Sequence, residues 1–223
     1  ILFSSIIVIT GLIDDIFELS VSLRLSLQFI ASLILIGSGL SIETLGDYHS
    51  YSIELGIFGL LLTFVSVITL TNAINFIDGI DGLSSSIVLI SLLTIFLFVK
   101  INNSNLNLDY IVIFFFIIFV FFLININLFP INKVFLGDSG STFLGFMLSW
   151  ILIYYTQKEL NTLHPVLAIW CITLPCYDIL RVIIVRLFNK KNPMQPDRTH
   201  LHHILMNLGM SCFSTLILII ILS

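Results

Sequence analysis

The sequence predicts an all-α fold, a polytopic integral membrane bundle with about six whole and two partial transmembrane helices. Composition is the first observation, because 58% of the residues are hydrophobic and only 10% are charged, against roughly a quarter charged in an ordinary soluble domain. The second is that the apolar residues gather into segments separated by polar loops. The third is that Lys and Arg lie mainly in every second loop, as in membrane proteins of fixed orientation.

Six apolar segments are long enough, with flanking residues or tilt, to cross a hydrocarbon layer that takes about 20 helical residues. In lipid they must be helical, because every backbone polar group needs an internal partner. These segments are Leu25–Leu40, Gly56–Leu70, Ile87–Val99, Tyr110–Phe129, Ser141–Tyr155 and Val166–Leu187. Because Ile1–Ile13 and Phe213–Leu222 look incomplete, we expect residues 1–223 to be one transmembrane domain without its N-terminal spans and its C-terminal end.

Alternation along the chain places four loops on one side of the membrane and three on the other. Seven of the nine Lys and Arg residues fall on the first side, which the positive-inside rule makes cytoplasmic. The loops on that side are 14–24, 72–82, 131–140 and 188–210. The net charge of −4 argues against a nucleic-acid partner, which would need a basic face.

The loop after the segment Gly56–Leu70 is the densest in polar groups. It contains two amides, two carboxylates and two glycines, namely Asn72, Asn75, Asp78, Asp81, Gly79 and Gly82. Carboxylates at the end of a membrane helix are costly unless they meet water, a cation or a partner, which favours a functional site. The glycines would let the backbone approach a bulky anionic ligand. A plain turn is the alternative, because Asn, Asp and Gly are also ordinary turn residues.

The first cytoplasmic loop carries two adjacent carboxylates, Asp14 and Asp15, with Arg24 ten residues after Asp14. Adjacent carboxylates repel each other and titrate jointly unless a cation relieves them. From the residues alone, an exposed helix cap remains the alternative for the two acids, and a membrane anchor remains the alternative for Arg24.

The third cytoplasmic loop is a Gly137–Ser141 turn that enters an apolar helix. Free backbone N–H groups at the positive end of a helix dipole suit phosphate. Asp138 in this turn suits the Mg²⁺ that accompanies a nucleoside diphosphate. Ser141 and Thr142 would also serve as simple helix caps, and that alternative stays open.

The fourth cytoplasmic loop gathers three histidines behind an arginine: Arg198, His200, His202 and His203. A zinc site is the rival interpretation. However, His202 and His203 are adjacent and would point apart on a helix, and no cysteine joins them. We therefore expect the cluster to hold phosphate or sugar by hydrogen bonds.

Together, these loops resemble the polyprenyl-phosphate N-acetylhexosamine-1-phosphate transferases over nearly the whole chain, from Gly11 to Met210. Four motifs occur in that family's order: Asp14-Asp15 with Arg24; Asn72-x-x-Asn75-x-x-Asp78-Gly79-x-Asp81-Gly82-Leu83; Gly137-Asp138-x-Gly140-Ser141; and Asp197-Arg198-x-His200-x-His202-His203. The His-x-His-His form is similar to the branch that starts bacterial surface polysaccharides. The peptidoglycan branch, the phospho-MurNAc-pentapeptide translocases, has three consecutive histidines and is the alternative.

The resemblance implies transfer of N-acetylhexosamine 1-phosphate, with GlcNAc as the expected sugar, from a UDP-sugar to undecaprenyl or another polyprenyl phosphate, releasing UMP. This would be the first membrane step of a cell-surface polysaccharide. The implied catalytic residues are Asp14, Asp15 and Asp138, and Asp138 and Asn75 are the implied ligands of Mg²⁺, for which Mn²⁺ could substitute. The implied substrate-binding residues are Arg24, Asn72, Asn75, Asp78, Asp81, Arg198, His200, His202 and His203. A bacterial inner membrane and a site on the cytoplasmic face are also expected. The sequence leaves the oligomeric state open, with a homodimer as one candidate.

A cation-coupled membrane transporter is the alternative from another class. Transporters place their charged groups near the bilayer midplane on broken helices, whereas the acids here cluster in loops at one interface. Asp178 is the exception inside a span. A structural ion pair with Arg181, three residues later, and a feature of the family are the two interpretations, and we favour the ion pair. The pattern favours an interfacial enzyme.

Overall fold

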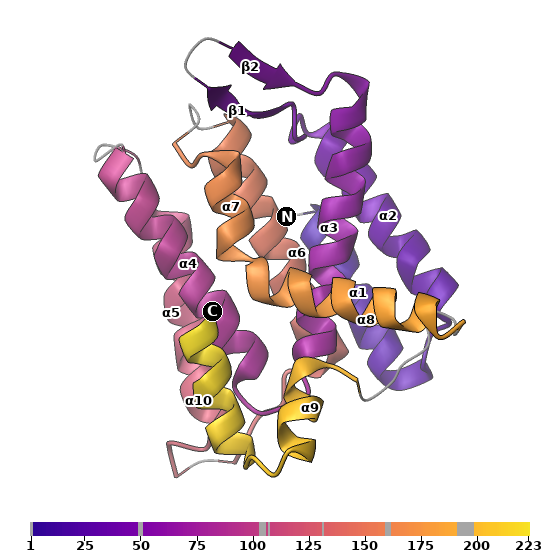
Figure 1. Cartoon of the computed structure of the whole chain (residues 1–223), viewed down its shortest axis with the longest axis vertical. Helices are drawn as coiled ribbons and strands as arrows, with labels where there is room; N and C mark the ends of the chain where they lie inside the picture. Colours follow the sequence, from indigo (N-terminus) through magenta and orange to yellow (C-terminus); the bar gives the residue numbers. More distant parts are fainter. Residues whose placement is uncertain are drawn as a thin grey trace.

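The computed structural model describes residues 2–48, 51–102, 106, 108–130, 132–158, 162–190 and 199–223. In these ranges the chain folds into a helical bundle with a small β-hairpin at one end (Figure 1). The helices are α1 (Leu2–Phe17), α2 (Val21–Gly37), α3 (Ile57–Ile77), α4 (Leu83–Asn102), α5 (Asp109–Asn125), α6 (Gly137–Ile153), α7 (Pro165–Cys171), α8 (Thr173–Phe188), α9 (Leu201–Asn207) and α10 (Cys212–Leu222). A π-helical turn, Tyr154–Lys158, continues α6.

Helix α6 packs against both α3 and α1, and two glycines allow these contacts. A Cβ on Gly145 of α6 would lie 2.8 Å from the carbonyl oxygen of Leu70 on α3. A Cβ on Gly11 of α1 would lie only 2.2 Å from the Cα of Ser139. The C-terminal part of α1 is therefore held directly against the first turn of α6.

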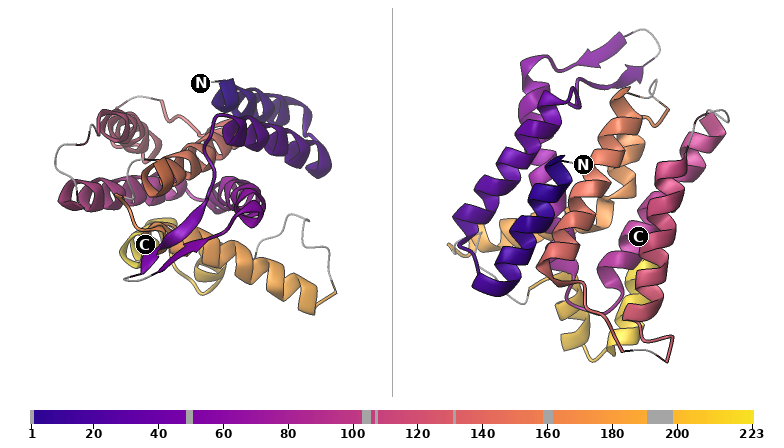
Figure 2. Two further views of the ribbon diagram at one scale, coloured as in Figure 1. Left: turned by 90° about the horizontal axis from the view of Figure 1, so that it is seen from above. Right: turned by 180° about the vertical axis from the view of Figure 1, so that it is seen from behind.

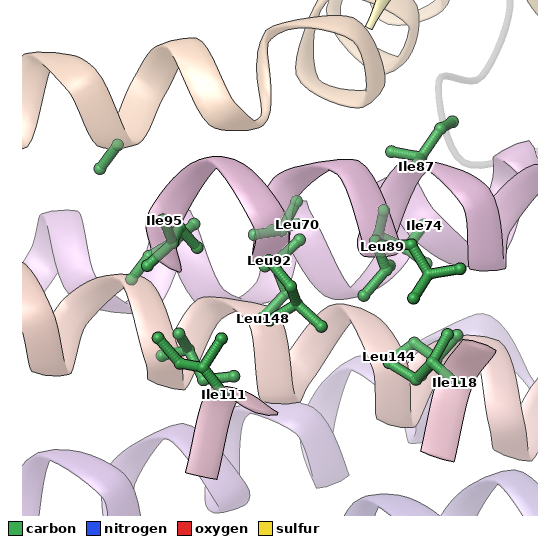
Figure 3. Close-up of a cluster of buried hydrophobic side chains, with 14 of the residues drawn as sticks. Leu70, Ile74, Ile87, Leu89, Leu92, Ile95, Ile111, Ile118, Leu144 and Leu148 are labelled. Atoms are coloured by element: carbon green, nitrogen blue, oxygen red, sulfur yellow. The ribbon is translucent and has the colours of Figure 1, made fainter. Parts of the chain in front are cut away.

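The larger apolar core joins α3, α4, α5 and α6, and Figure 3 shows its side chains. Its members include Leu70, Ile74, Ile87, Leu92, Ile111, Ile118, Leu144 and Leu148. A second cluster around Ile7, Leu35, Val67 and Phe146 joins α1 and α2 to α3 and α6. Because lipid is as apolar as these side chains, their close packing, more than the hydrophobic effect, determines which helix ends meet.

Helices α3 and α4 are long and apolar enough to cross a membrane, and α7 with α8 makes a third candidate if that bent pair is one span. Within the described ranges, α2, α5 and α10 are apolar but shorter. The predicted helical bundle is confirmed, while the count of six whole spans stays a prediction.

The predicted span Val166–Leu187 is not one straight helix, because the chain bends by 74° between α7 and α8. Pro175 in the first turn of α8 has no N–H to donate to the carbonyl of Cys171, four residues earlier, and its ring would clash with that carbonyl. The hydroxyl of Ser91 on α4 donates to this carbonyl instead, at 2.6 Å. Helix α8 therefore runs across the bundle (Figures 1 and 2).

The all-α expectation also needs a correction at the loop between α2 and α3. Strands β1 (Thr44–Tyr48) and β2 (Tyr51–Glu54) pair there in an antiparallel hairpin. The side-chain amide of Gln157 accepts from the backbone N–H groups of Glu43 and Thr44 and donates to the carbonyl of Thr44, which ties the hairpin to the end of α6. The hairpin and α9 lie at opposite ends of the bundle (Figure 1).

Candidate active site

The first turn of α6 holds the carboxylate of Asp138, but its backbone N–H groups already have an anionic partner. The N–H of Asp138 donates to Oδ1 of Asp15 at 2.8 Å, and the N–H of Ser139 donates to Oδ2 at 3.3 Å. The predicted phosphate position at this helix end is therefore filled by the Asp15 side chain from α1. The hydroxyls of Ser141 and Thr142 donate to carbonyls within the same turn, and the N-cap position of α6 is Leu136, which makes no side-chain capping bond.

The two adjacent carboxylates of α1 have different surroundings. Asp14 is buried, and it accepts from the backbone N–H of Leu19 at 2.7 Å and from Nη1 of Arg24 at 3.0 Å. It thereby fixes the turn between α1 and α2 and the position of the guanidinium. Asp15 is exposed and reaches α6. The interpretation of both residues as exposed caps is wrong for Asp14.

Asn75 at the end of α3 and Arg24 on α2 both approach Asp138. Nδ2 of Asn75 donates to Oδ1 of Asp138 at 3.1 Å and to the hydroxyl of Ser141 at 2.8 Å. Nη1 of Arg24 lies 3.7 Å from Oδ2 of Asp138. Residues far apart in the sequence therefore meet at one carboxylate, of which about half remains open to solvent.

A cavity of about 310 Å³ lies beside this carboxylate. It is lined by Asn75, Asp78, Gly79, Ile80, Asp81, Asn125, Phe135, Leu136, Gly137 and Asp138, and we call it the acidic cavity. Lys133 forms an ion pair with Asp81 at its rim. Among the described residues, two of the three carboxylates in this cavity lie near a cation: Asp81 pairs with Lys133, and Asp138 lies near Arg24.

Burial and like charge shift the titration of two of these acids. Burial, followed by the carboxylates of Asp138 and Asp81, raises the pKa of Asp78 to about 6, although the Ser84 hydroxyl donates to Asp78 and opposes the shift. Burial also raises the pKa of Asp138, against the lowering effect of the Asn75 hydrogen bond. A cavity in which ionised carboxylates are disfavoured would gain free energy from a bound cation.

Asn125 is a site residue that sequence reasoning missed, because it lies inside the predicted span Tyr110–Phe129. Its Oδ1 accepts from the backbone N–H of Gly82 at 2.5 Å, and its Nδ2 donates to the carbonyl of Val134 at 2.8 Å. One buried amide therefore joins the turn after α3 to the loop before α6. A polar residue within an apolar segment was the signal that could have revealed it.

We call the fourth cytoplasmic loop, residues 188–210, the histidine loop. Its residue His202 contacts the turn after α3. The imidazole of His202 packs directly on Gly79, because a Cβ on Gly79 would lie only 2.1 Å from Nε2 of His202. His202 is buried, and neither ring nitrogen has a hydrogen-bond partner among the described residues. Burial, with the neighbouring rings of His203 and His200, lowers the pKa of His202 to about 4.

His200 is anchored by Asp178, which sequence reasoning assigned only to an ion pair. The pair with Arg181 is confirmed at 2.9 Å, and Nδ1 of His200 also lies 2.7 Å from the same carboxylate. Asp197 and Arg198 of the fourth motif lie outside the described residues.

Asn72 occupies a different place from the other predicted ligands. Its amide forms a reciprocal pair with the buried amide of Gln28, at 2.7 and 3.4 Å, and so joins α3 to α2. Asn72 lines a second cavity of about 130 Å³ between α2, α3 and α8, which we call the apolar groove. The groove is lined by Val21, Arg24, Leu25, Ile68, Thr69, Asn72, Phe76, Ile179, Val182, Ile183 and Arg186. Arg24 therefore borders this groove and also approaches Asp138.

The zinc interpretation of the histidines has no structural support within the described ranges, where no group of three His, Cys, Asp or Glu side chains is arranged to hold a metal ion. Mg²⁺ needs no such cage, because it keeps several waters and binds through one or two carboxylates plus substrate phosphates.

Comparison with known proteins identifies the family. Residues 1–156 match the family described as glycosyl transferase family 4. This chain belongs to that family. A relative from Escherichia coli (strain K12), named undecaprenyl-phosphate alpha-N-acetylglucosaminyl 1-phosphate transferase, is 31% identical over 219 residues, which are 97% of this chain and 60% of the relative. The protein of that name from Yersinia pestis is 32% identical over the same coverage.

A further relative, from Bacillus subtilis (strain 168), is named probable undecaprenyl-phosphate N-acetylglucosaminyl 1-phosphate transferase. It is 31% identical over 207 residues, which are 92% of this chain and 57% of the relative. The chain thus spans about 60% of the length of the curated relatives it matches.

Proposed function

We propose that this family 4 chain forms the catalytic part of an enzyme that transfers N-acetylhexosamine 1-phosphate, and GlcNAc 1-phosphate in particular, from a UDP-sugar to undecaprenyl or another polyprenyl phosphate and releases UMP. The position of Arg24 carries the proposal. Arg24 borders the apolar groove, and its Nη1 atom lies 3.7 Å from Oδ2 of Asp138 at the acidic cavity. A water-soluble donor and a lipid acceptor would have to meet at such a junction.

The apolar groove suits the lipid acceptor. Aliphatic side chains of α2, α3 and α8 line it, so a prenyl chain can lie there without exposing polar backbone. Arg24 and Arg186 are the charged residues in its lining, and guanidinium groups hold phosphate well. The relatives' names, which contain undecaprenyl phosphate, agree with this assignment.

The acidic cavity suits the diphosphate of the donor together with Mg²⁺. Its carboxylate and amide oxygens are the hard ligands that Mg²⁺ prefers, and the raised pKa values of Asp78 and Asp138 indicate that added positive charge would be favourable there. Asp138 and Asn75 would hold the ion, and Mn²⁺ would be an imperfect substitute. When bound, the ion orients the diphosphate and offsets the charge that develops during transfer.

In the proposed reaction an oxygen of the lipid phosphate attacks the β-phosphorus of the donor, and UMP leaves. Phosphoryl transfer of this kind depends mainly on positioning and charge neutralisation. Arg24 would neutralise the incoming lipid phosphate, and Asp14 holds its guanidinium in place. Asp15 keeps the first turn of α6, and with it Asp138, in a fixed position, so we assign Asp15 to positioning rather than proton removal.

The remaining predicted residues would bind the donor. Asp78 and Asp81 would shape the nucleotide pocket. Phe135, which is 71% exposed beside the acidic cavity, would offer a ring face on which the uracil base could stack. His200, His202 and His203 would contact the nucleotide sugar, as would Arg198. The site would lie on the cytoplasmic face of a bacterial inner membrane, because UDP-sugars are present in the cytoplasm.

UMP release tests the proposal. Membranes holding the full-length protein should release UMP only when a UDP-N-acetylhexosamine and a polyprenyl phosphate are both present, and excess EDTA should stop the reaction. A panel of UDP-sugars would identify the donor. Release without the lipid, or turnover that persists in EDTA, would contradict the proposed reaction or its metal, respectively. Cation-driven uptake without UMP release would favour the transporter alternative.

A further inference from the structure

The carboxylate of Asp178 is buried in α8, a helix that is otherwise mostly apolar. Its residue is only 2% exposed, and it belongs to the same helix as Ile179 and Val182, which line the apolar groove. A carboxylate in such surroundings is costly unless it is paired and hydrogen-bonded. The hydrogen-bond partners of this carboxylate therefore indicate its role.

Asp178 and Arg181 together hold three consecutive residues at the start of α9, namely Thr199, His200 and Leu201. Oδ1 accepts from Nη2 of Arg181 and from the backbone N–H of Leu201, both at 2.9 Å, and Oδ2 lies 2.7 Å from Nδ1 of His200. Nη2 of Arg181 also donates to the carbonyl of Thr199. The pair of Asp178 and Arg181 therefore fixes both the backbone and the imidazole of the histidine loop.

This arrangement determines which nitrogen of His200 carries the proton. A carboxylate that is paired with a guanidinium can only accept, so Nδ1 of His200 must donate to it. In the neutral imidazole Nε2 is then an acceptor, and it points away from Asp178. The ring is further held by stacking parallel to His202, at 6.1 Å between centroids, and by Phe76 at 5.6 Å.

We propose that Asp178 is a positioning residue of the transfer reaction: it holds His200 with the proton on Nδ1, so that Nε2 accepts a hydrogen bond from a hydroxyl or amide N–H of the sugar nucleotide. This inference rests on the proposed function, and it narrows the partner of His200 to a hydrogen-bond donor of the substrate instead of a phosphate oxygen. The ring contacts Asp178 on α8, Phe76 on α3 and His202 on α9, while Arg181 pairs with Asp178 and His203 packs against His202.

The variant Asp178→Asn tests this assignment, because asparagine has nearly the same shape but can donate to Nδ1 and so favour the opposite tautomer. In the full-length enzyme kcat/KM for the UDP-sugar should fall about tenfold to a hundredfold, while KM for the polyprenyl phosphate stays within about twofold. Asp47→Asn on the exposed hairpin is the matched control and should leave both parameters unchanged. A merely structural role would lower both substrates' kcat/KM alike or only reduce the melting temperature, and either result overturns the proposal.

A double variant shows whether Asp178 acts through His200. If it does, Asp178→Asn should cause no further loss in a His200→Gln background, because the group it positions is already gone. A full additional loss in that background would overturn the proposal.

The ¹⁵N resonances of His200 give a readout that does not depend on activity. In histidine-labelled wild-type protein at neutral to mildly alkaline pH, His200 should show the Nδ1–H tautomer, and Asp178→Asn should shift it toward Nε2–H. A protonated ring or an Nε2–H tautomer in the wild type would overturn the proposal even if Asp178→Asn fails to fold. Wild-type protein that shows the expected tautomer but releases no UMP would instead refute the proposed function.

Discussion

Asp14 and Asp15 show how adjacent residues of the same type come to have separate tasks. At the end of α1, Asp14 is buried against Arg24 and the α1–α2 turn, and the neighbouring Asp15 reaches the first N–H groups of α6. The sequence predicts the functional region but not this division, because the division depends on how closely Gly11 lets α1 approach Ser139. The sequence likewise does not reveal the roles of Asp178 and Asn125, because their partners His200 and Gly82 are distant in the sequence.

Asp78→Asn should stabilise the metal-free protein at neutral pH. Asp78 ionises near pH 3.8 when unfolded and near 6 when folded, so between these values the folded state binds more protons and its stability falls as the pH rises. This loss of folding stability is complete above about pH 7. It amounts to at most about 3 kcal/mol, and the true value is smaller because Asp78 keeps some contact with water. Melting temperatures in EDTA from about pH 4 to pH 8 measure it.

The gain in melting temperature should appear on the alkaline side and vanish near pH 4, where the carboxyl is protonated in both states. Asp47→Asn is the control for the same chemical change at an exposed position. Equal melting temperatures of wild type and Asp78→Asn at pH 8 would show that the acidic cavity does not disfavour the ionised form.

At the scale of elements, an amide pair joins α2 to α3 beside the apolar groove, and we predict that it is structural. Asn72→Leu leaves the buried amide of Gln28 without its partner, and Gln28→Leu leaves the half-buried amide of Asn72 without it, so each should lower stability by about 1–2 kcal/mol. The two single variants should lower activity to a similar extent, and the double leucine variant should recover part of the stability. An activity loss confined to Asn72→Leu, at equal melting temperatures, would instead show that Asn72 contacts substrate.

Helix positions followed from apolar segments, but the shapes of two elements did not. The bend between α7 and α8 requires the Ser91 hydroxyl to compensate a carbonyl that Pro175 leaves free, and periodicity does not report that contact. The β1–β2 hairpin depends on Gln157 from another part of the chain. Local sequence patterns predict helices well in apolar segments, because backbone groups in lipid need partners within the segment. They predict poorly where a side chain distant in the sequence supplies a hydrogen bond to the backbone.

At the scale of the whole molecule, the hairpin and the acidic cavity belong to opposite ends of the bundle. A cysteine at Tyr51, which is 64% exposed, should react with an impermeant reagent from outside intact cells. A cysteine at Phe135, which is 71% exposed, should react only after permeabilisation. Both belong in a Cys212→Ser background, because that native cysteine is exposed. Reaction at Phe135→Cys in intact cells would reverse the predicted orientation.

The meeting of four loops at one end was predictable, because alternation of spans places them on the same side. Contacts between Asp15 and Asp138, Asn75 and Asp138, and His202 and Gly79 now join all four. The distance between the groups was not predictable, since it depends on the packing of α1, α3 and α6. The groove beside α8 was equally hidden, because it exists only where that helix leaves the direction of α7.

The fate of the β-phosphate tests the central claim most directly. Membranes with the full-length protein would receive polyprenyl phosphate and UDP-GlcNAc labelled with ³²P at the β-phosphate, and wild type would be compared with Asp138→Asn. We predict that the label moves to a lipid diphosphate sugar while unlabelled UMP is released, and that Asp138→Asn abolishes this transfer without changing membrane insertion. Label found in released UDP, with the sugar alone on the lipid, would contradict phosphosugar transfer, and unchanged transfer by Asp138→Asn would contradict the assignment of the site.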